Sequence, residues 1–125
     1  QAALESGWGT SRFAREGLNL FGQWCFKPGC GLTPKRRRSQ HLHEEARYDS
    51  AEEAVRRYIH NLNSLPAYQP LRRIRAAARQ KEQAADGQTL AEGLVAYSEQ
   101  RQLYVQKVRH MILANDLQRF DHPRR

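Results

Sequence analysis

The chain has 125 residues, which is enough for one domain with one core and too few for two. Its net charge of +8 predicts attraction to polyanions, either nucleic acid or the anionic polymers of a bacterial envelope. No apolar run approaches the roughly 20 residues that span a bilayer, and no signal peptide is visible. Because the chain lacks an initiator Met and opens within an expected helix, we expect an export signal and the first helical turns to lie outside these residues.

The first predicted element is a short helix over residues 1–6. Gln-Ala-Ala-Leu-Glu has high helix propensity, and Gly7 can end the helix in the left-handed conformation without steric cost. Glu5 therefore lies in the last turn, where the negative end of the helix dipole and the neighbouring Trp8 both disfavour its ionised form. This position suits an acid that stays protonated near neutral pH, although an isolated glutamate is more often a solvated surface charge.

A second short helix and a turn follow. Ser11 is a candidate N-cap for a helix that ends at Gly17, and residues 19–22, Asn-Leu-Phe-Gly, form a turn with apolar anchors. Residues 23–49 then lack a helical period and contain two prolines and a basic run, Lys-Arg-Arg-Arg. A two-residue alternation over residues 39–48 predicts a small hairpin or β-lobe in this region.

The two cysteines, Cys25 and Cys30, flank a predicted turn. Pro28-Gly29 suits the central pair of a type II turn, which would bring the two thiols close together. A disulfide would fit an oxidising compartment such as the periplasm, and the alternative is a reduced pair. A zinc site needs more ligands than these two residues supply.

From residue 50 the pattern becomes clearly helical. A capping box at Ser50 opens a long helix, and a further helix is expected over residues 69–80. Asp86-Gly87 is expected as a turn, a second capping box at Thr89 opens a short helix through Tyr97, and the last helix covers residues 102–115. The expected buried positions of the three longer helices are Ala51, Ala54, Val55, Tyr58, Ile59 and Leu62, then Leu71, Ile74 and Ala78, then Tyr104, Val108, Met111 and Ile112.

Two motifs carry a resemblance to a known family. Gln-Ala-Ala-Leu-Glu-Ser-Gly-Trp-Gly-Thr-Ser at residues 1–11, followed by Asn-Leu-Phe-Gly at residues 19–22, closely resembles the glucosaminidase family of bacterial cell-wall hydrolases, glycoside hydrolase family 73. Residues 22–26 and 58–63 look more like its Bax-type branch, which is related to the hydrolase domain of flagellar rod-assembly proteins. The resemblance implies a mainly α (α+β), lysozyme-like fold with a β-lobe beside the active-site cleft. We expect residues 1–121 to form this domain, truncated at its N-terminus, and residues 122–125 to be a disordered tail.

The resemblance implies that Glu5 is the catalytic acid. Cleavage of a glycosidic bond commonly needs a second carboxyl group, and the β-lobe offers Glu44 and Glu45. The alternation places Glu44 on the face with Leu42, which a lobe would turn toward the helical body, and Glu45 on the face with His43. We therefore expect Glu44 to be the second carboxylate, with Glu45 as the alternative because the register of a short strand can slip by one residue.

Aromatic residues are the candidates for binding substrate. Tyr68 resembles a tyrosine that follows the family's core helix and lines its cleft, so it is assigned to catalysis, with a buried core tyrosine as the alternative. Trp8, Phe21, Trp24 and Tyr97 are assigned to sugar binding, and core packing is the alternative for Phe21 and Trp24. Tyr58 lies in the apolar stripe and is expected to pack in the core, and His41 with His43 lacks a clear third ligand for a metal.

The leading hypothesis is an endo-β-N-acetylglucosaminidase that hydrolyses peptidoglycan glycan strands. A lysozyme or lytic transglycosylase on the same fold is the close alternative, and a non-catalytic, basic wall-binding module is the second. We expect no cofactor, no metal and no nucleic-acid partner, since no zinc-finger spacing or RNA-binding aromatic motif is present. A monomer in the periplasm or cell envelope is expected, with anionic envelope polymers as further partners.

Overall fold

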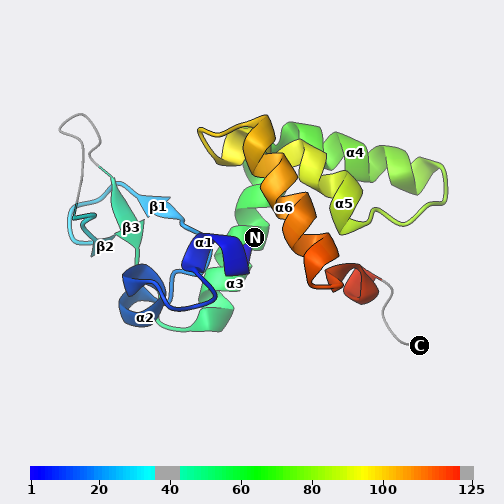
Figure 1. Cartoon of the computed structure of the whole chain (residues 1–125). Helices are drawn as coiled ribbons and strands as arrows, with labels where there is room; N and C mark the ends of the chain where they lie inside the picture. Colours follow the sequence, from blue (N-terminus) through cyan, green and yellow to red (C-terminus); the bar gives the residue numbers. More distant parts are fainter. Residues whose placement is uncertain (36–42, 122–125) are drawn as a thin grey trace. The chain divides into compact units, whose positions relative to one another are not determined.

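The computed structural model describes residues 1–35 and 43–121, which divide into two compact units, Gln1–Ile59 and His60–Arg125. Most of the described residues are helical, and the first unit adds one three-stranded antiparallel sheet (Figure 1). The predicted mainly α, α+β class is therefore confirmed. The predicted tail, residues 122–125, and residues 36–42 of the lobe lie outside the described residues.

The helices of the first unit begin and end where the local chemistry predicts. Helix α1, Ala2–Ser6, ends at Gly7, which has a φ of 57°. Helix α2, Arg12–Gly17, begins after Ser11, whose hydroxyl accepts a hydrogen bond from the Ala14 amide. Helix α3, Ala51–Ser64, begins after Ser50, whose hydroxyl accepts from the Glu53 amide at 3.0 Å as the capping box predicts.

The sheet consists of three very short strands. These are β1, Trp24–Cys25, β2, Gly31–Leu32, and β3, Glu44–Ala46, in the order β1-β3-β2. A turn joins β1 to β2, in which the Cys30 amide donates to the Lys27 carbonyl at 3.0 Å and Gly29 has a φ of 82°. This is the turn that Pro28-Gly29 predicts, and the expected disulfide between Cys25 and Cys30 is present.

The interior of the first unit is built around a buried amide, that of Asn19. Its side-chain nitrogen donates to the carbonyl oxygens of Gln23 and Ala46 at 2.8 and 3.0 Å, and its oxygen accepts from the Gln23 amide at 3.1 Å. The side chain of Gln23 in turn donates to the Ala54 carbonyl in α3 at 3.2 Å. Because an amide side chain both donates and accepts, Asn19 joins the turn at residues 19–22 to strand β3.

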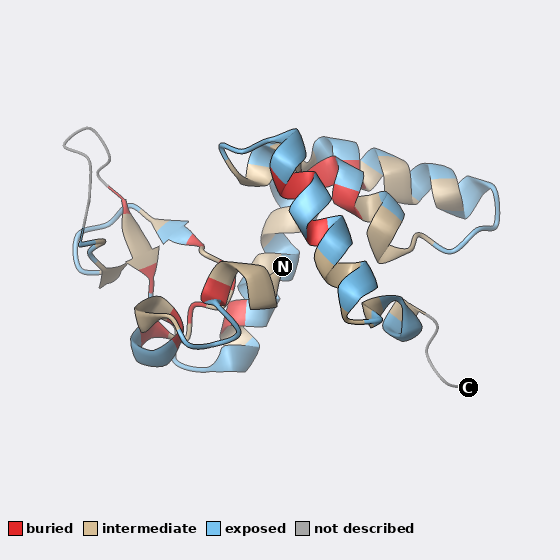
Figure 2. Cartoon of the chain, in the orientation of Figure 1, coloured by how far each residue is buried: buried red, intermediate tan, exposed pale blue. Residues whose placement is uncertain are grey.

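The second unit is built from helices packed on apolar side chains. Its elements are the 3₁₀ helix η1, Pro66–Tyr68, helix α4, Gln69–Gln80, helix α5, Gly87–Leu90, the 3₁₀ helix η2, Ala91–Tyr97, helix α6, Gln102–Ala114, and the 3₁₀ helix η3, Leu117–Asp121. Gly93 lies directly against α4, because a Cβ atom at this position would lie 2.3 Å from the Cα of Leu71. The buried apolar residues of this unit are Leu71, Ala91, Leu94, Tyr104, Val105 and Val108 (Figure 2).

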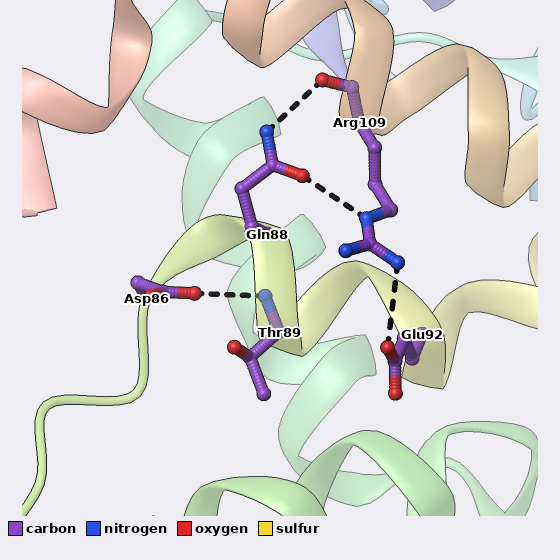
Figure 3. A network of polar contacts seen from close by, with 5 residues as sticks. All are labelled: Asp86, Gln88, Thr89, Glu92 and Arg109. Atoms are coloured by element: carbon purple, nitrogen blue, oxygen red, sulfur yellow. Dashed lines mark hydrogen bonds and ion pairs between the residues drawn. The ribbon is translucent and has the colours of Figure 1, made fainter.

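The predicted start of the short helix before Tyr97 is wrong. The N-cap is Asp86, whose carboxylate accepts from the Thr89 amide at 2.8 Å, so that Gly87 is the first helical residue and not part of a turn (Figure 3). An aspartate is a better N-cap than a threonine, and here it lies three residues before the predicted cap. Gln88 then exchanges two hydrogen bonds with Arg109, which ties α5 to α6.

The buried stripe expected along α3 is also largely wrong. Ala54 is buried as predicted, but Val55 and Ile59 are 38% and 50% exposed. Helix α3 runs across the boundary between the two units, so its apolar positions are not gathered into one core. Among the residues that the structure describes, no helix has the length and apolar character needed to cross a bilayer.

Candidate functional site

Glu5 lies in the last turn of α1, as the sequence predicts, and the backbone just after it is fixed by Ser6. The buried hydroxyl of Ser6 donates to the Ala2 carbonyl at 2.6 Å and accepts from the Gly9 amide at 2.9 Å. The amide of Trp8 donates to the Ala3 carbonyl at 2.9 Å. These bonds hold the end of the helix in one conformation, so the backbone from which the Glu5 side chain extends is fixed.

Gly22 lies against the carboxyl of Glu5. A Cβ atom at Gly22 would lie 2.9 Å from Oε2 of Glu5, and the φ of Gly22 is 65°, in the left-handed region. Both the space and the backbone conformation therefore require glycine at this position. The sequence singled out Asn-Leu-Phe-Gly as a turn and gave no sign that its glycine contacts the expected catalytic acid.

Glu45 is the second carboxyl that the structure associates with Glu5. One of its oxygens, Oε2, is buried and has no hydrogen-bond partner among the described residues. Burial, and next the negative charge of Glu5, raise the pKa of Glu45 to about 7. Glu45 is the alternative that the sequence left open, and its environment favours a carboxyl that keeps its proton close to neutral pH.

The sheet has two chemically different faces, as the predicted alternation requires. Glu45 is paired with Trp24 of β1 and Leu32 of β2, and directly opposed residues in an antiparallel sheet point to the same side. Glu44 is paired with Cys25 and points to the opposite side. The two glutamates are therefore adjacent in sequence but have different surroundings.

The carboxylate of Glu44 accepts hydrogen bonds from the segment that joins β1 to β2. Its Oε2 accepts from the Gly29 amide at 2.8 Å and its Oε1 from the Gly31 amide at 3.2 Å. Both oxygens thus have backbone partners, in contrast to the buried oxygen of Glu45. The catalytic role expected for Glu44 stays a prediction, and the contacts favour Glu45 for that role.

The aromatic candidates of the first unit differ in exposure. Trp24 is 52% exposed and stacks on the buried ring of His43, with ring centroids 3.7 Å apart, and Trp8 is 63% exposed. Phe21 is buried and stacks on Tyr58 at 3.9 Å, which favours the packing alternative for Phe21. Both tryptophans offer ring surface to a ligand. His41, the other histidine of the predicted pair, lies outside the described residues.

The two remaining candidates, Tyr68 and Tyr97, lie in the second unit. Their ring centroids are 5.8 Å apart, and Tyr97 stacks on the buried Tyr104 at 5.6 Å. Both are half-buried, so each ring contributes to packing while keeping part of its surface in contact with solvent. Their roles in catalysis and sugar binding stay predictions.

One known protein family matches nearly the whole chain. The glucosaminidase family model, described as mannosyl-glycoprotein endo-beta-N-acetylglucosaminidase, matches residues 1–117. The chain belongs to the glucosaminidase family. This confirms the resemblance drawn from the sequence motifs, and membership supports a function of the peptidoglycan hydrolase type and a location in the envelope or outside the cytoplasm.

A curated relative agrees with the Bax-type branch of the glucosaminidase family. The chain is 37% identical over 103 residues to Protein bax of Escherichia coli (strain K12), and the match covers 82% of this chain. The match covers 36% of that protein, so the chain spans about a third of the length of the curated relative. No solved structure matches the chain.

Proposed function

We propose that this glucosaminidase-family chain is an endo-β-N-acetylglucosaminidase that hydrolyses the glycan strands of peptidoglycan, with Glu5 and Glu45 as its reacting carboxyl pair. We propose residues 1–121 as the domain and the periplasm or cell envelope as its location. The observation that carries the proposal is the buried, unpartnered oxygen of Glu45 in the field of Glu5. Desolvation next to a like charge is how active sites keep one carboxyl protonated near neutral pH.

The pair can supply the two things that glycosidic cleavage needs. A proton must reach the leaving oxygen, and the positive charge that develops on the sugar must be stabilised. Because burial, and next the negative charge of Glu5, raise the pKa of Glu45 to about 7, Glu45 holds a proton up to about that pH. The family motif assigns proton donation to Glu5, so the proposed mechanism requires the proton of Glu45 to pass to Glu5 when the sugar binds, which leaves the negative charge on Glu45. The scheme holds whether water, Glu45 or the substrate's N-acetyl oxygen attacks the sugar.

Trp24 is the proposed sugar platform next to this pair. Its half-exposed ring lies on the same sheet face as Glu45, and the stack on His43 fixes the ring in place. Sugar rings present flat C–H faces that pack on exposed aromatic rings. We propose Trp8, which lies three residues after Glu5 and just past the end of α1, as a second residue that contacts the sugar. Tyr68 and Tyr97 also stay proposed substrate contacts.

The proposal is tested by Glu5→Gln and Glu45→Gln on purified peptidoglycan, followed by turbidity clearance. Each variant should lose activity by roughly 100-fold or more, the usual contribution of a general acid or charge stabiliser. The matched control is Glu52→Gln, because Glu52 is exposed on α3 and forms only a surface ion pair with Arg56 at 3.0 Å. A Glu5→Gln variant that clears the wall as fast as the parent would remove the proposed acid.

The products distinguish the enzyme proposed here from its alternatives. Mass spectrometry of released muropeptides should show N-acetylglucosamine at the new reducing end. N-acetylmuramic acid at that end would indicate a lysozyme, and its anhydro form a lytic transglycosylase. Binding to the wall with no new reducing ends would indicate the non-catalytic binding module.

A further inference from the structure

The loop from Cys25 to Gly31 is closed at several points. The disulfide joins Cys25 to Cys30, and the carboxylate of Glu44 reaches across from β3 to the amides of Gly29 and Gly31, on either side of Cys30. The carbonyl of Cys30 also accepts from the Arg47 amide at 3.3 Å. A carboxylate that accepts two backbone N–H groups makes charge-assisted hydrogen bonds, which are shorter and stronger than those between neutral groups.

The same loop lies directly on the backbone of Glu45. A Cβ atom at Gly31 would lie only 1.9 Å from the Glu45 carbonyl oxygen, so the loop and strand β3 are in contact with no space between them. Leu32, the next residue of the loop strand, is the cross-strand partner of Glu45. The loop therefore contacts the backbone of Glu45, and its following strand borders the sheet face that carries the Glu45 side chain.

We infer that Glu44 is a positioning residue for Glu45: its carboxylate clamps the loop at residues 25–31 onto β3 and so keeps the Glu45 carboxyl buried beside Glu5. The catalytic meaning of this clamp depends on the proposed function, while the clamp itself is a property of the first unit. The inference gives the two adjacent glutamates separate tasks. Glu44 accepts hydrogen bonds from two backbone amides. Glu45 has a carboxyl oxygen without a hydrogen-bond partner among the described residues, and this oxygen is available for the reaction.

Among the described residues, charged and titratable groups lie on the sheet face of Glu45 and on α2, which packs against the sheet. On its own sheet face is His43, which stacks on Trp24, and the two cysteines do not titrate because they are bonded to each other. On α2, which packs against the sheet, Arg12 donates to the Thr33 carbonyl and Arg15 to the Thr10 carbonyl. The charged or titratable side chains of the first helices and of the strand that carries Glu45 include Glu5, Arg12, Arg15, Glu16, His43 and Arg47.

The test is Glu44→Gln with the titration of Glu45 followed by ¹³C NMR of the side-chain carboxyl. Glutamine keeps the size of the side chain, but its amide nitrogen cannot accept the hydrogen bond of either glycine amide. Loss of one clamp bond should admit water to Glu45 and lower its pKa from about 7 toward 4.5, by about one pH unit or more. The matched control is Glu16→Gln on α2, which should leave this titration unchanged.

A second variant covers the case in which Glu44→Gln does not fold. Cys25→Ser with Cys30→Ser loosens the same loop from its other side and keeps Glu44, and it should lower the pKa of Glu45 in the same direction. The pH profile of wall hydrolysis should follow, with its alkaline limb moving down by the same amount. Activity should fall by about tenfold in Glu44→Gln, less than in Glu45→Gln.

The outcomes separate this inference from the proposed function. A Glu45 titration that does not move in Glu44→Gln overturns the clamp, even if Glu45→Gln is inactive as proposed. If that unmoved titration comes with a loss of activity as large as in Glu5→Gln, Glu44 itself takes part in the reaction. A Glu45 titration that moves as expected, together with full activity of Glu45→Gln, supports the clamp and removes the proposed function.

Discussion

The two units differ in what fills their interiors. Every buried polar side chain of the described residues belongs to the first unit, namely Ser6, Asn19, Gln23 and His43, and so does the disulfide. The second unit buries aliphatic side chains and one tyrosine. Hydrogen bonds are directional and fix backbone groups in place, whereas apolar contacts are not directional and stabilise the fold through burial and close packing. The unit that holds the carboxyl pair is thus the one whose geometry is set by directional bonds.

This difference has a consequence for stability. A buried amide such as Asn19 is costly to disturb because backbone groups that it bonds are then left without a partner. A close helix contact such as that between Gly93 and Leu71 is costly to disturb because atoms would overlap. Both tryptophans of the chain, Trp8 and Trp24, lie in the first unit, so tryptophan fluorescence reports the unfolding of that unit and far-UV circular dichroism weights the helices of both.

Asn19→Ala should have the largest effect on stability. It leaves the Gln23 amide and the Ala46 carbonyl without their Asn19 partner, and it removes one of the two donors to the Gln23 carbonyl, which still accepts from the Ala46 amide at 2.9 Å. We expect a loss of about 4 kcal/mol, from penalties of about 1–3 kcal/mol for each buried group. In urea unfolding, the transition followed by tryptophan fluorescence should shift more than the one followed by circular dichroism.

The control for this variant is Asn63→Ala in the second unit. Asn63 is exposed and accepts one hydrogen bond from Arg75 at 2.8 Å, so its removal should cost no more than about 0.5 kcal/mol. If the urea midpoints from both probes shift by the same amount in Asn19→Ala, the two units unfold together. The difference between their interiors then does not give them separate stabilities.

Gly93→Ala should have the next largest effect, with the opposite pattern. The added methyl group would overlap the backbone and side chain of Leu71, and the strain should cost about 3 kcal/mol. Here circular dichroism should show the shift and tryptophan fluorescence should not. Gly87→Ala is the matched control, because its methyl group would meet Cδ1 of Ile112 at 3.4 Å and the carboxylate oxygens of Asp121 at 3.8 Å, with no overlap, and alanine favours the helix.

Local chemistry predicted most of the element boundaries. The end of α1 at Gly7, the caps at Ser11 and Ser50, the turn at Pro28-Gly29 and helix α4 over residues 69–80 all follow from neighbours in sequence. The error at Asp86 is also local, since two overlapping cap patterns compete there and the aspartate is used.

The site could be predicted only in part, because its decisive contacts are long-range. Alternation correctly separates Glu44 from Glu45, but it cannot say which sheet face lies in the field of Glu5. The contact of Gly22 with Glu5 joins residues that are 17 positions apart, and that of Asn19 with Ala46 joins residues 27 apart. No helix or strand period predicts such contacts. The resemblance of the motif therefore identified Glu5 as the expected acid, and the structure was needed to favour Glu45 as the second carboxyl.

The smallest expected effect is the pH dependence of stability that Glu45 gives to the first unit. The folded-state pKa of Glu45 is about 7 and its ordinary value is 4.5, so the folded protein binds this proton more tightly than the unfolded chain. Its contribution to stability is therefore fully present below about pH 4.5 and is lost as the pH rises through 7. Glu45→Gln, which mimics the protonated carboxyl, should keep that contribution and flatten the fall in melting temperature between these values.

The fall should be visible in tryptophan fluorescence, because the uncompensated charge belongs to the first unit. Glu5→Gln should flatten it only partly, since burial is the larger cause of the raised pKa and the charge of Glu5 the smaller one. Equal flattening by both substitutions would mean that the charge of Glu5 dominates, and no flattening by either would mean that Glu45 is solvated. The ratio of the two effects thus measures how far burial and how far the neighbouring carboxylate prepare this glutamate for proton chemistry.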